Sequence, residues 1–346
     1  MSIAAFSERR VANAKLLRAA LWGLIVAFAD VGMAAAQTKL EPAATKWTVS
    51  ENFEKSRKAR LNLSGAACAT KVPPFASCVI VNDEKKYAQF FSMDETVIHP
   101  GKVIRLTADG KKGDPDAEGA AYDGGYFYIT GSHGRSRHHP KEKNKSSYVI
   151  FRFRVDTATG KPTFRVSDEK VIGVESSHRI RAVIKAEVRK FYDKQLSKNG
   201  ANIEGIAVRD GRIYFGLRGP SDDGEAFVIS VDARAAFTPD KDLQAVSNKL
   251  QLGPYTGIRD LAAVADGMLV LTGPVNEQLV TPALRHWDPK TGVLGPAREL
   301  QIPDKAKKGK AETLLILKDV EGEPWRALVM FDGVKNGAPT EYAIPR

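Results

Sequence analysis

The hydrophobic and polar positions of this chain follow one pattern five times. Each copy has a polar or acidic residue, then small and apolar residues, then a turn, and then an apolar run that reads as a β-strand. Internal repetition of this kind is typical of solenoids and propellers, in which one small unit is copied. The first six residues of the five copies are 62–67, 116–121, 202–207, 258–263 and 310–315.

The turns are the second part of the pattern. Asp-Gly stands between apolar runs at 123–124, 210–211 and 266–267, and glycine provides the positive φ that a tight hairpin turn needs. Third strands are expected at 148–155 and 226–231. Weaker fourth strands are expected at 249–252 and 298–302. Four strands at intervals of about 50 residues predict an all-β fold, a β-propeller.

The spacing of the copies predicts the number of blades. The acidic or hydroxyl residue of each copy recurs after 54, 86, 56 and 52 residues. We therefore expect five blades, with six as the alternative if the long interval holds another one. That interval contains two insertions, a polar loop at 131–147 and a segment at 176–200. Apolar residues at helical spacing predict an amphipathic helix over 178–198, with Arg181 on a solvated basic face.

The first 36 residues have the three parts of a secretory signal peptide. Basic residues precede an apolar run at 19–29, and the alanines at 34–36 suit cleavage before Gln37. The apolar run is shorter than the roughly 20 residues that a membrane span needs. We expect a periplasmic or secreted protein that does not span a membrane after cleavage.

Cleavage would leave two parts of unequal length. One is an N-terminal segment at 37–60, in which residues 47–49 are expected to close the last blade as a strand from the opposite end of the chain. The other is a single propeller domain at 61–346.

The expected location outside the cytoplasm changes the interpretation of the net charge and of the two cysteines. The chain has a net charge of +11, of which residues 1–36 carry +2, so the mature part carries +9. In an exported protein this charge favours anionic ligands or surfaces over nucleic acid.

An oxidising compartment predicts a disulfide between Cys68 and Cys78, with two free thiols as the alternative. Closing this short loop would stabilise the fold by roughly 2–3 kcal/mol.

Several motifs resemble the domain of unknown function 3616 family. They lie at 63–68, 81–84, 114–121, 131–134 and 202–207, and the resemblance extends over residues 60–340. The repeated Glu-Gly with its following strand is similar, more distantly, to the esterase-like phytase domain group. The first resemblance implies a propeller-like fold and no established activity. The second implies phosphoester chemistry by analogy alone. Neither implies particular catalytic residues.

In a propeller, the innermost strands line a central channel, so equivalent positions of the copies form a ring. That ring would hold Ser64, Glu118, Glu204, Asp260 and Glu312. Carboxylates that converge near one axis do not all stay ionised without cations or basic partners. Calcium suits oxygen ligands of this kind. Arg218 and Arg259, expected near the same mouth, are a second solution. Hydrogen bonds from each acid to the backbone of the neighbouring blade are a third.

A further cluster lies in the polar loop. Ser132, His133 and Arg135, with the glycines beside them, suit phosphate or carboxylate groups, while a solvated basic loop is the alternative. Metal binding by His133, His138 and His139 is disfavoured because the last two are adjacent, which is poor geometry for one site.

The sequence contains no Walker loop, dinucleotide fingerprint, zinc-protease motif or nucleophile elbow. It therefore assigns no catalytic residue, leaves open whether the protein is an enzyme, and indicates no oligomeric state. We expect a cell-envelope propeller that binds a ligand or partner at the channel mouth, the charge favouring an anionic one. The alternative is a metal-dependent hydrolase, of phosphoesters by analogy, in which the carboxylates hold the cation.

Overall fold

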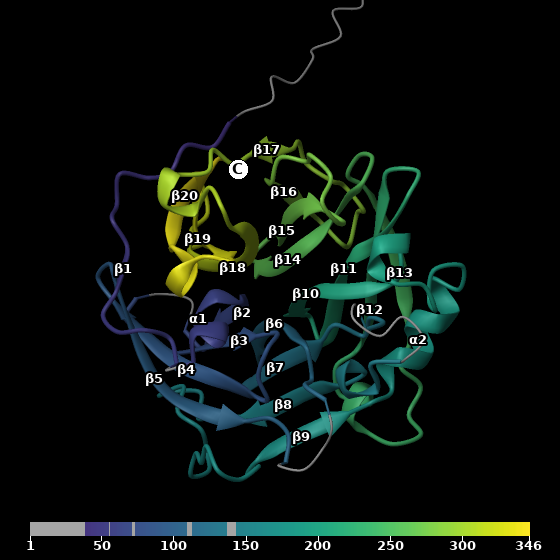
Figure 1. The fold of residues 1–346 in the computed structure, drawn as a ribbon, viewed down its shortest axis with the longest axis horizontal. Coiled ribbons are helices and arrows are strands. Elements are labelled where there is room, and N and C mark those ends of the chain that lie inside the picture. The colour runs from purple at the N-terminus through teal and green to yellow at the C-terminus, as the bar shows by residue number, and fades with distance from the viewer. Residues whose placement is uncertain (1–38, 55, 71–72, 109–112, 137–142) are drawn as a thin grey trace, which may run out of the picture. The chain divides into compact units, whose positions relative to one another are not determined.

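The structure is a computed structural model that describes residues 39–54, 56–70, 73–108, 113–136 and 143–346, all within the compact unit Gln37–Arg346. The predicted signal peptide at 1–36 lies outside the described residues. Within this unit, five β-sheets surround a common centre as the blades of a propeller (Figure 1). The predicted all-β, five-bladed fold is confirmed.

Each blade begins at the centre, and the chain then runs outward strand by strand. Strands β2, β6, β10, β14 and β18 are the innermost, as Figure 1 shows. The blades are formed, in chain order, by β2 (Leu63–Cys68), β3 (Phe75–Asn82), β4 (Tyr87–Asp94) and β5 (Val97–Arg105); β6 (Ala117–Asp123), β7 (Tyr126–Gly131), β8 (Ile150–Arg154) and β9 (Val174–Ser177); β10 (Asn202–Arg209), β11 (Arg212–Asp222), β12 (Glu225–Asp232) and β13 (Val246–Gln251); β14 (Thr256–Val264), β15 (Gly267–Pro274), β16 (Ala283–Trp287) and β17 (Arg298–Glu299); and β18 (Lys310–Lys318), β19 (Trp325–Asp332) and β20 (Thr340–Ile344).

The Asp-Gly signals mark the hairpins between first and second strands. Asp123 pairs with Tyr126 across the β6–β7 turn, and Arg209 pairs with Arg212 across the β10–β11 turn. Two residues lie between each pair, which is the loop length that Asp-Gly favours. The expected fourth strands also form, but they are shifted or short, as β13 and β17.

The N-terminal segment departs from its expected place. Residues 48–49 form β1 (Thr48–Val49), which pairs in parallel with β5 at the outer edge of the first blade. Our prediction that residues 47–49 complete the last blade is therefore wrong. Pro42 instead bridges Tyr342 of the last blade, and Leu40 bridges Leu300 beside the fourth. We call residues 39–53, which run along the fourth, fifth and first blades, the belt.

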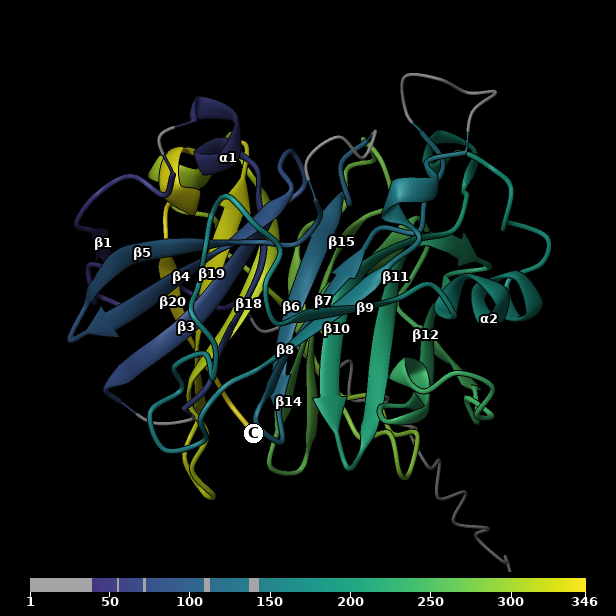
Figure 2. The same cartoon turned by 90° about the horizontal axis from the view of Figure 1, so that it is seen from below.

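In the part of the chain that the structure describes, helices are few and lie outside the blades. They are α1 (Arg57–Leu61), α2 (Ile180–Glu187) and the short 3-10 turns at Lys145–Ser147, Leu196–Lys198, Ala235–Phe237, Asp304–Ala306 and Lys335–Gly337. The view in Figure 2 places α1 at one face of the propeller and the end of the chain toward the other. Among the described residues, no helix has the length and apolar character needed to cross a membrane.

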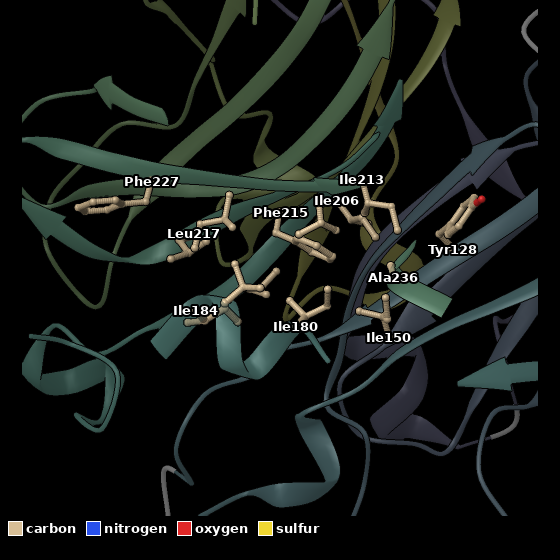
Figure 3. Packing of buried hydrophobic residues seen from close by; sticks show 14 of the residues in the cluster. Tyr128, Ile150, Ile180, Ile184, Ile206, Ile213, Phe215, Leu217, Phe227 and Ala236 are labelled. Carbon is tan, nitrogen blue, oxygen red and sulfur yellow. The ribbon is translucent and has the colours of Figure 1, made fainter. Parts of the chain in front are cut away.

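The predicted helix at 178–198 is shorter than expected. Helix α2 ends at Glu187, because Val188 leaves the helical conformation at φ −121° and ψ 44°. Figure 3 shows Ile180 and Ile184 of α2 packed toward Phe215 and Leu217 of β11. The apolar periodicity therefore reflects packing against the third blade, part of it by turns rather than by helix.

Arg181 does not lie on a solvated face, as predicted, but is buried with 7% of its surface exposed. Its guanidinium carbon lies 4.2 Å from the centroid of the Tyr148 ring and 3.7 Å from that of Tyr192. It donates to the carbonyl oxygens of His133 and Tyr192. The charge is thus accommodated by two aromatic faces and two carbonyl groups, so α2 is attached to the loop after β7.

The two cysteines are directly opposite each other on β2 and β3 and form a disulfide. The predicted pairing of Cys68 with Cys78 is confirmed. The bond joins the first two strands of the first blade next to the proline-containing loop that connects them.

Candidate functional site

A β-bulge lies near the start of each innermost strand. At each one the pairing register shifts by one residue, so one side chain is left without a cross-strand partner. Bulges of this kind redirect a side chain and are common near functional sites. The bulged residues are Ser64, Glu118, Glu204, Arg259 and Glu312.

The fourth member of this ring differs from the one that the sequence alignment predicted. The register shift lies between Ile258 and Asp260, which makes Arg259, not Asp260, the equivalent of Glu204. Asp260 takes the next position, where the second and third blades have Gly119 and Gly205. At that position neighbouring inner strands nearly touch: a Cβ atom on Gly119 would lie 2.7 Å from the carbonyl oxygen of Glu204.

Two arginines neutralise the carboxylates on one side of the ring. Glu204 accepts from Arg218 at 2.6 Å through Oε1 and pairs with Nε of Arg259 at 3.1 Å through Oε2. The guanidinium of Arg259 also pairs with Glu312. The side chains of Glu204 and Arg259 expose 3% and 1% of their surface. Buried charges need oppositely charged partners, because desolvation otherwise exceeds the Coulomb gain.

Arg259 is the centre of the network. Burial lowers its pKa to about 10, against the opposing effect of the Glu204 carboxylate, and the charges of Glu118 and Asp332 also favour its protonated form. Glu118 is itself buried, at 3% exposure. Of the solutions that the sequence left open for the ring, the arginine one is seen for Glu204 and Glu312.

Asp260 adopts a different arrangement, hydrogen-bonded to backbone. Its carboxylate accepts from the amide of Leu261 and from the amide of Leu314 on β18, both at 2.8 Å. Burial raises the pKa of Asp260 well above its usual value, while these amide hydrogen bonds lower it. Asp260 thus links the fourth blade to the fifth.

The ring does not assemble an obvious metal centre. In the described ranges, no three His, Cys, Asp or Glu side chains are placed to hold one metal ion. Ser64 lies on β2 with 2% exposure, and its hydroxyl has no hydrogen-bond partner among the described residues.

The residues of the predicted anion-binding loop are engaged with the protein itself. Ser132 donates to the carboxylate of Asp116 and accepts from the amide of Gly134 at 3.1 Å. Arg135 donates to the carbonyl oxygen of Asp193 at 2.9 Å. The remaining members that we considered, His138 and His139, lie outside the described residues.

His133 is fully buried, and its ring is stacked on Tyr148 with centroids 6.2 Å apart. Burial, followed by the nearby Arg181 charge, lowers its pKa to about 3. A neutral, enclosed imidazole is not a binding group for an external anion. The loop therefore joins the second blade to the segment around α2.

A pocket that the sequence reasoning missed lies toward the C-terminal ends of the five innermost strands. It has a volume of about 100 Å³. Every blade contributes, with walls that are largely apolar: Ala67, Cys68, Thr70, Ala120, Ala121, Tyr122, Asp123, Ile206, Ala207, Val208, Leu261, Ala262, Ala263, Leu314, Leu315, Ile316 and Asp319. The signal was present as the small and apolar residues after each bulge, which we interpreted only as strand.

Several known structures resemble this chain. Hydrazine synthase from Kuenenia stuttgartiensis matches with 11% identity and a TM-score of 0.39, over 82% of this chain and 59% of that one. The calcium-binding protein regucalcin from Agrobacterium tumefaciens matches with 11% identity and a TM-score of 0.38, over 88% and 95%. An exo-beta-1,3-galactanase from Phanerochaete chrysosporium matches with 8% identity and a TM-score of 0.47, over 87% and 63%. No curated protein matches the chain.

The family comparison agrees with the resemblance seen in the repeated motifs. The model of the family described as "Protein of unknown function (DUF3616)" matches residues 80–158 and 188–341, which is more than half of the chain and extends from β3 to β20. The protein belongs to this family, DUF3616.

Proposed function

We propose that this protein is an exported, ligand-binding propeller whose site is the apolar pocket at the C-terminal ends of the innermost strands. The observation that carries the proposal is that all five blades line this pocket. Ligand sites are typically concave, mostly apolar and equipped with a few polar groups, as this one is. A site built from every blade is also held rigidly, because no single loop forms its wall.

Two features support export. Residues 1–36 have the composition of a signal peptide, and the disulfide Cys68–Cys78 is of the kind that persists in oxidising compartments. Cys68 also lines the pocket. The disulfide therefore braces the first-blade wall of the proposed site.

We do not extend the proposal to hydrolysis. A metal-dependent hydrolase needs carboxylates that are available to a cation or a substrate. Glu204 and Glu312 are instead paired with arginines, and Asp260 is hydrogen-bonded to backbone amides. These contacts support a role in holding the blades together.

The test is to fill the pocket. Ala262→Phe and Ala67→Phe each place a ring inside it, and Ala343→Phe adds the same ring at an exposed position on β20. The probe is 2-phenylethanol, with thermal unfolding as the readout. A ligand present at ten times its Kd stabilises a protein by about 1.4 kcal/mol, which raises the Tm by about 2–4 °C for a domain of this size.

We expect this shift in the wild type and in Ala343→Phe, and its loss in both pocket variants. Two pocket variants are needed because one overfilled wall can prevent folding. An equal shift in all four proteins would show binding elsewhere. The absence of any shift in the wild type would contradict a pocket for small apolar ligands.

A further inference from the structure

Part of the pocket wall is main chain. Among the described strands, β2, β6, β10, β14 and β18 are each the last strand of their sheet, and Figure 1 shows all five around the centre. The inner edge of each one therefore has no further strand of its own blade to pair with. A strand edge of this kind presents a row of N–H and C=O groups, and here that row lies toward the centre.

The hairpin turns decide which residues direct these groups inward. The residues that flank a two-residue turn are a hydrogen-bonded pair, and bonded and non-bonded pairs then alternate along the ladder. Arg209 and Arg212 flank the turn after β10, so the next pair inward, that of Val208, is a non-bonded one. The N–H and C=O groups of Val208 therefore point to the inner edge. By the same count, those of Tyr122 on β6 and of Ala263 on β14 do so as well.

Asp260 shows how such inner edges bind a hydrogen-bond acceptor. Its carboxylate accepts from the amides of Leu261 and Leu314, both at 2.8 Å. Burial raises the pKa of Asp260, and hydrogen bonds from the amides of Leu314, Leu261 and Ile206 act against that effect. These amides belong to three different blades, so inner-edge N–H groups of neighbouring blades converge on one acceptor. Two residues farther along β10 and β14, the same edges reach the pocket.

The third and fourth blades give this pocket apolar side chains and polar main chain. Their described lining residues are Ile206, Ala207, Val208, Leu261, Ala262 and Ala263. A ligand at this part of the wall therefore finds hydrogen-bonding groups only in the backbone, as the N–H and C=O groups of Val208 and Ala263. Donors and acceptors are both present, and none of them carries a formal charge.

The charged side chains at the pocket are engaged within the protein. Among the described lining residues, the acidic ones are Asp123 and Asp319, and none is a lysine or arginine. Asp319 accepts from the indole nitrogen of Trp325 at 3.1 Å and pairs with Arg346 at 2.5 Å. Asp123 also has an interaction partner in the protein. The pocket therefore offers no counter-charge that is reserved for an ionic ligand.

We propose that the ligand is a neutral molecule with an apolar body and one group that both donates and accepts hydrogen bonds, such as a primary amide. This inference rests on the proposed function of the pocket. The amide oxygen accepts from the inner-edge N–H groups of Val208 or Ala263, and the amide NH2 donates to carbonyl oxygens of the same edges. The apolar body displaces water from the side chains of the wall. A charged group would lose hydration here without gaining an opposite charge.

The first part of the experiment compares probes that share a phenyl ring on a three-carbon chain. They are 3-phenylpropanamide, 3-phenylpropionate, 3-phenylpropylamine and propylbenzene, and they end in a neutral amide, an anion, a cation and a methyl group. Their Kd values are measured with the full mature chain, by calorimetry for the three polar probes and by displacement of 3-phenylpropanamide for propylbenzene. We expect the amide to bind at least about tenfold more tightly than either ion.

The second part removes one inner-edge N–H group at a time. Val208→Pro and Ala263→Pro each delete an N–H group that points to the pocket and spare the ladder, since proline is tolerated in edge strands where the N–H group faces away from the sheet. Two variants on different blades are used because one of them can fail to fold. Ala263→Val is the control, because it adds a side chain of similar size and keeps the N–H group.

The readout is the Kd of the amide divided by that of propylbenzene, which cancels any change in the space for the apolar body. We expect this ratio to rise about fivefold in one or both proline variants, the loss of one hydrogen bond, and to stay within about twofold of the wild type in Ala263→Val. An ion that binds as tightly as the amide, or an unchanged ratio in both proline variants, would overturn this inference and leave the pocket function standing. Binding of none of the probes would overturn both.

Discussion

Glu204 is the residue on which the central ion network depends. Its two oxygens are taken by Arg218 and Arg259, and all three side chains are at most 5% exposed. Removing the Glu204 carboxylate would leave the buried guanidinium groups of Arg218 and Arg259 with less compensating charge. Because a buried arginine without a partner is much more costly than a paired one, this cost is the main contribution of Glu204 to stability.

We expect Glu204→Gln to lower the free energy of unfolding by about 3–5 kcal/mol. The matched control is Glu225→Gln in the same blade, where the partner Lys249 at 2.6 Å is 52% exposed and a loss below about 1 kcal/mol is expected. Urea denaturation of the two variants checks this. Equal, small losses would mean that the network is solvated and does not hold the blades.

His133 makes the stability of the protein depend on pH. Its pKa is lowered from 6.5 to about 3 in the folded state, mainly by burial. Between these values the unfolded chain binds a proton and the folded chain does not. The free energy of unfolding therefore decreases as the pH falls through this window. His133 accounts for about 1.4 kcal/mol of that decrease for each pH unit.

His133→Asn removes this contribution, and asparagine tolerates the positive φ of 52° at this position. We expect the variant to be less stable than the wild type at pH 7, because the imidazole packs on Tyr148. The difference should shrink as the pH falls toward 4, as measured by urea midpoints at several pH values. A difference that stays constant would show that His133 is protonated within the fold.

Single-residue roles were the least predictable part of the site. The repeats placed Ser64, Glu118, Glu204 and Glu312 at equivalent positions, and the bulges confirm that equivalence. The fourth copy was misaligned by one residue, because the acidic Asp260 was matched with the acidic residues of the other copies in place of Arg259. A bulge is set by strand pairing between neighbours, and the sequence of one strand alone does not reveal which residue it leaves unpaired.

At the scale of the element, hairpins were predicted well and the helix was not. Asp-Gly acts locally, so the turn after β10 follows directly from Asp210 and Gly211, which form its two-residue loop. After β6 and β14 the same dipeptide marks the hairpin but overlaps only part of the loop, which is residues 124–125 and 265–266 respectively. The segment after α2 has helical periodicity, but its stability depends on tertiary contacts. The amide of Ala201, for example, donates to the carbonyl oxygen of Phe191, which fixes a compact turn there. Arg181 was likewise misread, because its aromatic partner Tyr148 comes from a distant part of the chain.

At the scale of the whole molecule, the belt contributes to the last blade among the described residues as the antiparallel bridge of Pro42 to Tyr342 on β20, not as a full strand. In the described part of the chain, the last blade takes its strands β18, β19 and β20 from the C-terminal end, and the first takes β2 to β5 from the N-terminal part. The seam between them is joined by a shared apolar cluster that includes Phe75 and Ile98 of the first blade and Leu315 and Leu328 of the last. The belt crosses the same seam.

Trp47 connects the belt to both sides of this seam. Its side chain is buried in the shared cluster, and its indole nitrogen donates to Glu341 of the last blade at 2.9 Å. The strand that follows it, β1, pairs with the first blade. Loss of the indole side chain would therefore remove a contact to the first and to the last blade at once. The closure of the propeller should be especially sensitive to this residue.

We expect Trp47→Ala to lower the free energy of unfolding by about 3–5 kcal/mol, the usual cost of deleting a buried aromatic side chain. Trp47→Phe keeps most of the packing and loses the hydrogen bond to Glu341, so a smaller loss of about 1–3 kcal/mol is expected. The neighbouring Lys46→Ala is the control, because Lys46 is exposed in the same segment and should change stability by less than about 0.5 kcal/mol. Equilibrium urea unfolding of the three variants measures these differences. If Trp47→Ala were as stable as Lys46→Ala, the shared cluster alone would close the ring, and the belt would only lie along it.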